Sequence, residues 1–172
     1  ENDVGRSVNG IKVKNSYQGM AISLKDNVVH DNVVSGIVTE YVSTSSTLIP
    51  TFDGNIIYGN TNGLNLNVTG AVSLPRHQFY DNYYDIYNNT GYAVDAKSVW
   101  WGVDTTNLLN AGTHPRDMAN IYDSSDDGAK GTVDYLDWLT VYAQPAAPVL
   151  TAVQSPTNTT AQILSGTKEA ET

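Results

Sequence analysis

Residues of similar character return in this chain after an interval of 22 positions. The matched pairs are Asn55 and His77, Asn60 and Asn82, Leu64 and Ile86, and Val72 and Val94. A repeat this short indicates one supersecondary unit stacked on a copy of itself, because a single unit of that size cannot bury its own apolar side chains. The sequence therefore predicts a solenoid.

Each repeat contains three short apolar runs separated by Asn or Gly, a pattern typical of three brief strands joined by tight turns. One repeat has these runs at residues 55–60, 63–66 and 71–74. Asn, Gly, Thr, Ser, Val and Tyr are frequent while Leu, Glu and Lys are few, which favours strands and turns over helices. We expect an all-β chain of about four coils, with residues 40–53 forming an inserted loop.

Stacking of equivalent residues predicts two kinds of ladder along the solenoid. Asn32, Asn60 and Asn82 fall above one another at a corner, where their amides can hydrogen-bond from coil to coil across about 4.8 Å. By alternation along the strands, the side chains of His30, Tyr58 and Tyr80 should form an outward aromatic column. Such a column is either cross-strand packing or a surface that binds sugar rings.

The pattern Asn-apolar-x-x-x-Asn followed by Gly-Ile-x-Val resembles the PbH1 repeat of right-handed parallel β-helices, found in pectin-lyase-like and copper-delivery-type periplasmic proteins. The resemblance covers residues 2–100 and implies a right-handed parallel β-helix. It implies no single activity, since lyases, hydrolases, epimerases, tailspikes and passive surface stalks share the scaffold.

The end of the solenoid is indicated by Trp100 and Trp101, whose bulk suits covering an open apolar coil. Residues 101–139 resemble the terminus of many exported β-helix proteins of bacteria and archaea, written loosely as W-G-x-x-D, I-Y-D-x-x-D-D and G-x-V-x-Y-x-P-x-L. Asp137 stands where that pattern usually has Pro. Pro115 near a helix start, followed by Met118, Ile121 and Tyr122 on one face, predicts a short capping helix over 114–122.

The composition changes after the β-helix domain, which we place at residues 1–142. Residues 143–148 contain Pro145-Ala146-Ala147-Pro148 and read as a stiff linker. Residues 149–172 resemble the opening strands of bacterial immunoglobulin-like modules, cut short of the roughly 100 residues such a sandwich needs. We expect this extended tail to lie against a neighbouring chain by strand addition.

Charge and cysteine content exclude some partners. Eighteen acidic and nine basic residues give a formal charge of −9, which disfavours binding to nucleic acid. There is no Cys, so disulfides and Cys-ligated metals are ruled out. No apolar stretch reaches the roughly 18 residues of a membrane-spanning helix, so we expect no membrane insertion.

A β-helix lyase or epimerase would need a basic residue beside a carboxylate to take a proton. Two places on the coils offer such groups. They are His30 beside Asp31, and Arg76 beside His77 and Asp81. The alternative interpretation is that all five are solvated turn residues, and no other cofactor site is indicated.

Two further kinds of site have sequence signals. Asp123, Asp126 and Asp127, with Asp134 and Asp137 nearby, offer the oxygen ligands that Ca²⁺ prefers, although their spacing matches no known calcium loop. The alternative is a solvated acidic loop. Asn67, Asn88 and Asn158 begin glycosylation sequons, a pattern that also arises by chance in an Asn- and Thr-rich chain.

These observations favour a structural or adhesive segment of a secreted or cell-surface protein, self-associating through its tail and its open coil end. The alternative is the C-terminal part of a carbohydrate-active β-helix enzyme, or a glycan-binding module with a polysaccharide partner. The sequence does not decide whether the chain is an enzyme, although its few catalytic groups favour the structural reading.

Overall fold

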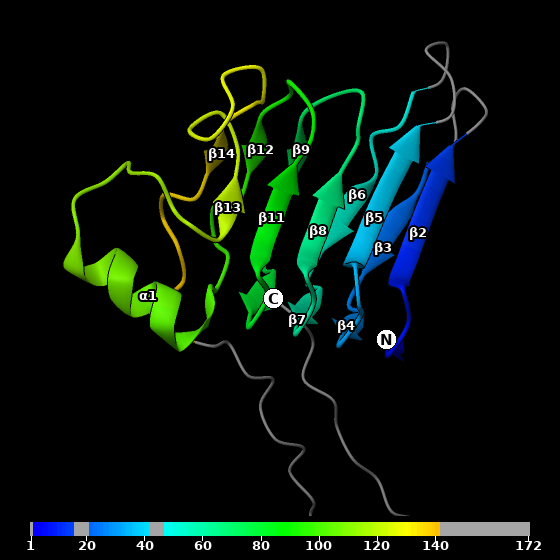
Figure 1. Ribbon diagram of the computed structural model, residues 1–172, viewed down its shortest axis with the longest axis horizontal. Coiled ribbons are helices and arrows are strands. Elements are labelled where there is room, and N and C mark those ends of the chain that lie inside the picture. The colour runs from blue at the N-terminus through cyan, green and yellow to red at the C-terminus, as the bar shows by residue number, and fades with distance from the viewer. Residues whose placement is uncertain (1, 16–20, 42–46, 142–172) are drawn as a thin grey trace, which may run out of the picture. The chain divides into compact units, whose positions relative to one another are not determined.

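The computed structural model of the chain describes residues 2–15, 21–41 and 47–141. Parallel strands form the sheets of a β-solenoid of about three turns, with one short helix (Figure 1). The all-β prediction and the solenoid prediction are confirmed. The predicted linker and immunoglobulin-like tail at residues 143–172 lie outside the described residues.

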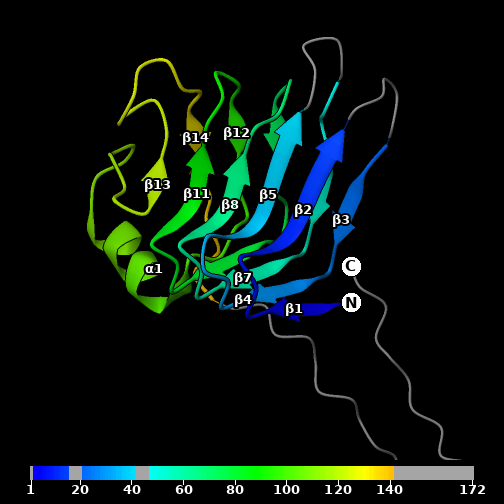
Figure 2. The same ribbon diagram turned by 45° about the vertical axis from the view of Figure 1, so that its right-hand side comes forward.

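Each turn of the solenoid contributes one strand to each of three sides. The first sheet contains β1 (Asp3–Gly5), β4 (Val28–His30), β7 (Ile56–Tyr58) and β10 (Gln78–Tyr80). The second sheet contains β2 (Asn9–Asn15), β5 (Ser35–Tyr41), β8 (Asn62–Leu66), β11 (Tyr84–Asn88) and β13 (Ile121–Tyr122). Figure 2 shows β2, β5, β8 and β11 side by side. The third side pairs β3 (Ser23–Lys25) with β6 (Thr51–Asp53), and β9 (Val72–Ser73) with β12 (Val94–Asp95) and β14 (Val133–Asp134).

The register agrees with the 22-residue repeat. Leu64 pairs with Ile86 and Val72 pairs with Val94, as the spacing predicts. Inward side chains of successive turns therefore stack into one apolar interior, in which Ile57 and Phe79 are fully buried. This burial is the main favourable term in the folding of such short strands, since none could be stable alone.

The corners of each turn require a left-handed backbone. At the corner before the first sheet, Asp26, Gly54 and Arg76 have φ between 52° and 60°. At the corner after it, Asp31, Gly59 and Asp81 have φ between 51° and 66°, and Gly102 continues the series at 71°. Asn, Asp and Gly tolerate this region best, which explains why short polar residues recur there.

The solenoid is closed at one end by Trp101 and helix α1 (Gly102–Ala111). Trp101 is 1% exposed and stacks on Phe79, with ring centroids 5.6 Å apart, so it continues the interior column of β7 and β10. Leu109 and Thr106 are the inward side chains of α1, and both are buried. The predicted role of Trp101 in covering the last coil is consistent with this placement.

The predicted helix over 114–122 is wrong. The helix lies at 102–111, and Ile121–Tyr122 forms strand β13, which pairs with Ile86 and Tyr87. The apolar spacing of Met118, Ile121 and Tyr122 fits a helix face, but a free edge of the second sheet offered Ile121 a buried position in the interior column. Tertiary pairing thus overrode the local pattern. The solenoid also has about three turns where four were expected, because α1 and its loop replace part of the last one.

Candidate functional site

The predicted aromatic column lies on the outer face of the first sheet. The rings of His30 and Tyr58 are 5.0 Å apart and inclined by 9°, and those of Tyr58 and Tyr80 are 4.7 Å apart and inclined by 6°. Rings stacked this closely cover one another's faces and present their edges to solvent. The middle of the column therefore functions as packing between coils, because a sugar ring stacks on an aromatic face.

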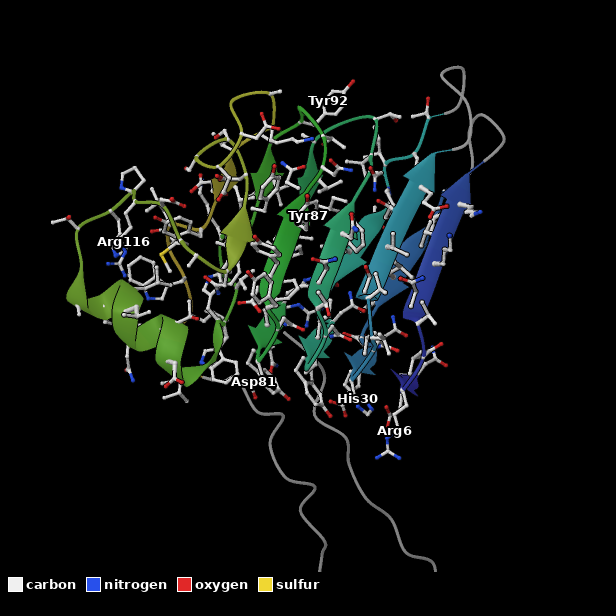
Figure 3. The ribbon with its side chains drawn as sticks, in the orientation of Figure 1. Arg6, His30, Asp81, Tyr87, Tyr92 and Arg116 are labelled. Carbon is white, nitrogen blue, oxygen red and sulfur yellow. The ribbon has the colours of Figure 1, made fainter. Side chains whose placement is uncertain are left out.

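His30 joins two carboxylates at the start of this column. Its Nε2 lies 2.7 Å from Asp3 Oδ1, and its Nδ1 lies 2.9 Å from Asp31 Oδ2. The hydrogen bond to Asp31, followed by that to Asp3, raises the pKa of His30. The imidazole is thus held as a bridge between two coils, at the lower edge of the molecule in Figure 3, where Asp81 also lies.

Arg76 forms an ion pair with Asp53 of the preceding coil. Its Nε and Nη2 donate to the two carboxylate oxygens of Asp53, at 3.0 and 2.8 Å. This bidentate pair is the main reason that the pKa of Asp53 is lowered. The two exposed groups are worth at most about 1 kcal/mol, because solvent screens them.

His77 is fully buried and belongs to a second amide ladder. Asn2 donates to Asn27, Asn27 donates to Asn55, and the Asn55 amide lies 3.0 Å from His77 Nε2, which accepts its hydrogen. His77 Nδ1 donates to the carbonyl of Pro75. Burial lowers the pKa of His77 to about 4, so the ring is neutral at pH 7 and holds the corner. The predicted alignment of Asn55 with His77 is thereby confirmed.

The five candidate catalytic residues do not converge. Arg76 and His77 sit at the corner before β10, whereas Asp81 follows it, and His30 and Asp31 lie two turns away at the end of β4. A three-residue strand spans roughly 10 Å, which is too far for a direct proton transfer between groups at its two ends. The structure thus brings together only His30 and Asp31, with Asp3 as a third partner.

The asparagine ladder of the other corner ends on a buried carboxylate. Asn32 donates through its backbone and side-chain nitrogens to Asn60 Oδ1, and Asn60 does the same to Asn82 Oδ1. Asn82 then donates to Asp85 Oδ1, and the Asn120 amide donates to the other carboxylate oxygen. The predicted ladder is confirmed, and Asp85 completes it.

Asp85 occupies the place that Gly63 has on the preceding turn. A Cβ on Gly63 would lie 2.7 Å from the carbonyl oxygen of Asp85, so a side chain does not fit inside the stack. Asp85 is tolerated because a loop carrying Asn120 follows it instead of another full coil. Burial raises the pKa of Asp85 to about 7, against the opposing hydrogen bonds from Asn82 and Asn120.

Replacing Asp85 by Asn should make the chain less sensitive to rising pH. The folded pKa of about 7 exceeds the ordinary value of 3.8, so the stability contributed by the protonated carboxyl is present below 3.8 and lost as pH rises through 7. When the pH is raised from 5 to 8, we expect the free energy of unfolding of the parent to fall by about 2 kcal/mol more than that of D85N. Urea unfolding at the two pH values measures this. A difference between the two proteins that does not change with pH would contradict it.

The acidic loop after β13 is held by its own backbone. Asp123 accepts hydrogen bonds from the backbone N–H groups of Ser125 and Val133, both at 2.8 Å. Asp126 accepts one from the Asp123 N–H, and Asp127 accepts one from the Ala129 N–H. Within residues 2–15, 21–41 and 47–141, no group of three His, Asp or Glu side chains is arranged to hold a metal ion. Calcium binding stays a prediction.

The three sequons differ in their surroundings. Asn67 is partly exposed and accepts a hydrogen bond from Asn89. Asn88 is fully buried and donates to the carbonyls of Tyr92 and Gly131, so its amide cannot carry a glycan in the folded chain. Asn158 lies outside the described residues.

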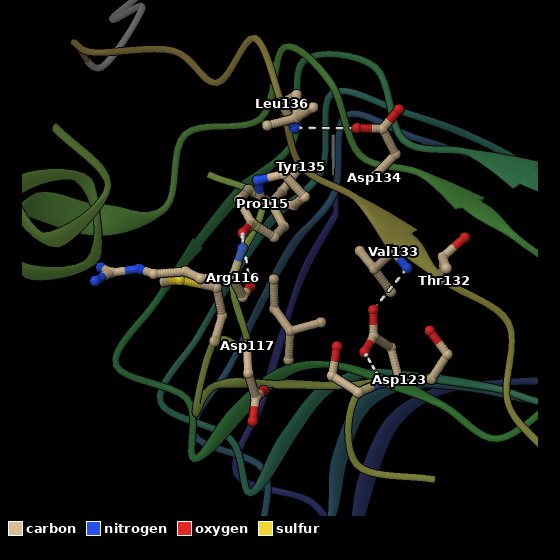
Figure 4. Close-up of a pocket in the computed structure, with 13 residues that line it drawn as sticks. Pro115, Arg116, Asp117, Asp123, Thr132, Val133, Asp134, Tyr135 and Leu136 are labelled. Atoms are coloured by element: carbon tan, nitrogen blue, oxygen red, sulfur yellow. Dashed lines mark hydrogen bonds between the residues drawn. The ribbon is translucent and has the colours of Figure 1, made fainter. Parts of the chain in front are cut away.

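Two hollows lie near the capped end. The larger, about 480 Å³, lies between the segment 115–125 and the segment 132–136 (Figure 4). Two of its polar side chains are engaged within the fold, since Tyr135 Oη accepts from the N–H of Arg116 and donates to its C=O, and Asp123 accepts from the N–H of Val133. The smaller, about 200 Å³, lies at the start of α1 and is lined by Tyr80, Asp81, Trp100, Trp101, Gly102, Val103, Asp104 and Thr105.

Sequence reasoning missed several of these residues. Asp85 belongs to no motif that the sequence offers, although its alignment with Gly63 indicates a carboxylate at a buried position. A tyrosine cluster on the second sheet was also missed. Tyr87 and Tyr122 stack with centroids 4.4 Å apart and Tyr84 packs against both, a contact that depends on β13 joining β11.

No protein-family model, curated protein or solved structure matches this chain. Across the residues that the structure describes, no helix is long and apolar enough to cross a membrane. What the chain does must therefore be argued from its own residues.

Proposed function

We propose that this chain is a structural or adhesive segment of a secreted or cell-surface protein, built from PbH1-type coils. The observation that carries this proposal is the use of polar side chains to join coil to coil. The two amide ladders, the His30 bridge and the Arg76–Asp53 pair each connect successive turns. Groups held in this way resist displacement, which suits a rigid spacer better than a reaction that must move protons.

The edge of the solenoid opposite to α1 supports self-association as part of this function. β1, β2 and β3 are the outermost strands of their sheets and pair on that side with no other described strand. An unpaired edge can add a strand from another chain. Lys12 and Lys14 on β2 both contact Glu40 of β5, so their charge is partly neutralised by the neighbouring strand.

Sedimentation velocity over a concentration series tests this part of the proposal. We expect the full chain to form larger species as concentration rises, and Val8→Glu, at an exposed position beside β2, to reduce them. Leu108→Glu, at an exposed position on α1, is the matched control and should leave association unchanged. A chain that stays monomeric throughout would contradict self-association, and turnover of a polysaccharide by this chain would contradict the structural assignment.

A further inference from the structure

The edge strand β1 of the first sheet is held by few contacts with the apolar interior. It pairs with β4 and with no other described strand. Its inward residue Val4 is only half-buried, whereas Val29, Ile57 and Phe79 at the same register of the following strands are fully buried. A short strand with so little buried apolar surface opens locally at a lower free energy than the rest of the fold. Polar contacts that fasten β1 therefore matter more than those between inner coils.

The His30 bridge, made of His30, Asp3 and Asp31, is such a contact and lies over β1. His30 pairs with Gly5, and a Cβ on Gly5 would lie 2.8 Å from Cε1 and 2.9 Å from Nε2 of the imidazole. The ring therefore occupies the space above β1 that a side chain at Gly5 would fill. From there Nε2 lies 2.7 Å from Asp3 of β1, while Nδ1 lies 2.9 Å from Asp31 on its own coil.

Both ring nitrogens face carboxylate oxygens, an arrangement that only the protonated imidazole satisfies. A carboxylate accepts hydrogen bonds, and a neutral imidazole has one N–H and one lone pair. The neutral ring can donate to Asp3 or to Asp31, and its other nitrogen then faces a negative oxygen with no hydrogen between them. The imidazolium donates to both at once. The geometry thus links this contact between coils to the proton on His30.

Among the described residues, the charged groups that contact the His30 ring are the two carboxylates of the bridge. Towards the next coil the ring stacks on Tyr58 of β7, whose pKa is raised by burial and by the same carboxylates, so its phenol is neutral. Arg6, at the corner after β1, forms no ion pair with Asp3 or Asp31. The hydrogen bond to Asp31, opposed by burial and reinforced by Asp3, raises the pKa of His30 above 6.5. The bridge is therefore complete below pH 6.5 and is lost as pH rises through the raised value.

We propose that the His30 bridge is a pH-dependent fastening of β1, in which the protonated ring holds β1 on β4 and the neutral ring lets β1 open and expose the edge of β4. The bridge decides at which strand the first sheet ends, and thus which backbone groups the open edge presents. It acts within one chain and does not require self-association, so its failure and that of the assembly model are separate results.

Amide hydrogen exchange of the full chain, measured by NMR, tests the proposal. The Val28 N–H donates to the carbonyl of Asn2, across the contact of β4 with the first coil, whereas the Ile56 N–H makes the same bond to Asn27 one coil further in. The pKa of His30 is first measured from its ring C–H signals. From one pH unit below that value to one above it, we expect the protection factor of Val28 to fall about 3-fold relative to that of Ile56, a size typical of a screened surface contact.

Two substitutions remove the proton dependence of the bridge. His30→Gln carries no titrating group, and the amide of Asp3→Asn can accept from one form of the ring and donate to the other. In both variants the ratio of the two protection factors should not change with pH, and D3N should also lower the pKa of His30. Asp117→Asn, an exposed carboxylate at the capped end, is the matched control and should change neither the ratio nor this pKa.

Three results would overturn the proposal. The pKa of His30 in the parent chain is 6.5 or lower, or D3N leaves that pKa unchanged, or the protection of Val28 and Ile56 changes in parallel with pH. A parallel change would show that the whole fold responds to pH through a group such as Asp85, and that β1 is equally attached in both states of His30.

Discussion

Replacing Trp101 by Ala is expected to lower the free energy of unfolding by about 3–5 kcal/mol, the usual cost of removing a fully buried large aromatic side chain. Trp101 is 1% exposed and stacks on Phe79, so its loss leaves a cavity under α1 at the end of the apolar interior. The neighbouring Leu109 would lose part of its burial as well. Urea unfolding followed by circular dichroism measures the change.

Trp101→Phe tests how much of this loss comes from removing the aromatic ring, because it keeps a smaller ring at the same position. The phenyl ring keeps most of the stacking on Phe79 and removes an indole N–H that has no partner among the described residues, so W101F should lose less than half as much as W101A. It also remains measurable if W101A fails to fold. Val103→Ala, at a position 65% exposed on α1, is the control and should change stability by less than about 0.5 kcal/mol. Equal losses for W101A and V103A would contradict the role given to Trp101.

Replacing Asn60 by Ala is expected to cost about 3–5 kcal/mol, because it interrupts the asparagine ladder in its middle. Asn60 Oδ1 accepts from the backbone and side-chain nitrogens of Asn32, and its Nδ2 donates to Asn82 and to the carbonyl of Tyr58. The substitution leaves several buried polar groups without partners, at about 1–3 kcal/mol each. Chemical unfolding of N60A against the parent chain measures the loss.

Asn107→Ala is the matched control for this change. Asn107 is exposed on α1, and we expect a change of less than about 0.5 kcal/mol. The double substitution of Asn32 and Asn60 should cost clearly less than the two single losses together, since both remove the same ladder bonds. Additive losses would mean that the two amides do not act as one network.

The fold could be predicted from the sequence because every turn of a solenoid needs the same kinds of residue at the same places. Every turn needs an inward apolar residue and a short polar corner, so the alignment of Asn60 with Asn82 and of Leu64 with Ile86 was visible in the spacing alone. The aromatic column followed from the same register, since alternation along a strand decides which side chains point outward.

The capped end could not be predicted in the same way, because it occurs once and has no second copy to align with. Residues 102–111 have little helical amphipathicity, since only Gly102, Thr106 and Leu109 of this helix are buried. The spacing around Ile121 fits a helix, but Ile121 pairs with Ile86 in the second sheet. The hollow beside α1 depends on this end. The sequence offered Asp81 as a candidate catalytic carboxylate, but that it lines one hollow with Asp104 depends on the position of α1.

The two amide ladders share a polarity that constrains how copies of the chain could join. From Asn2 through Asn27 to Asn55, and from Asn32 through Asn60 to Asn82, each hydrogen bond between two amides runs from Nδ2 on one coil to Oδ1 on the next. Two chains meeting edge to edge about a twofold axis at β1–β3 would set the amide oxygens of their Asn2 residues against each other. The other end of the solenoid offers no amide donor to match them, because one ladder ends at His77, the other ends at Asp85, and α1 covers that end, so head-to-tail stacking of copies cannot continue either ladder.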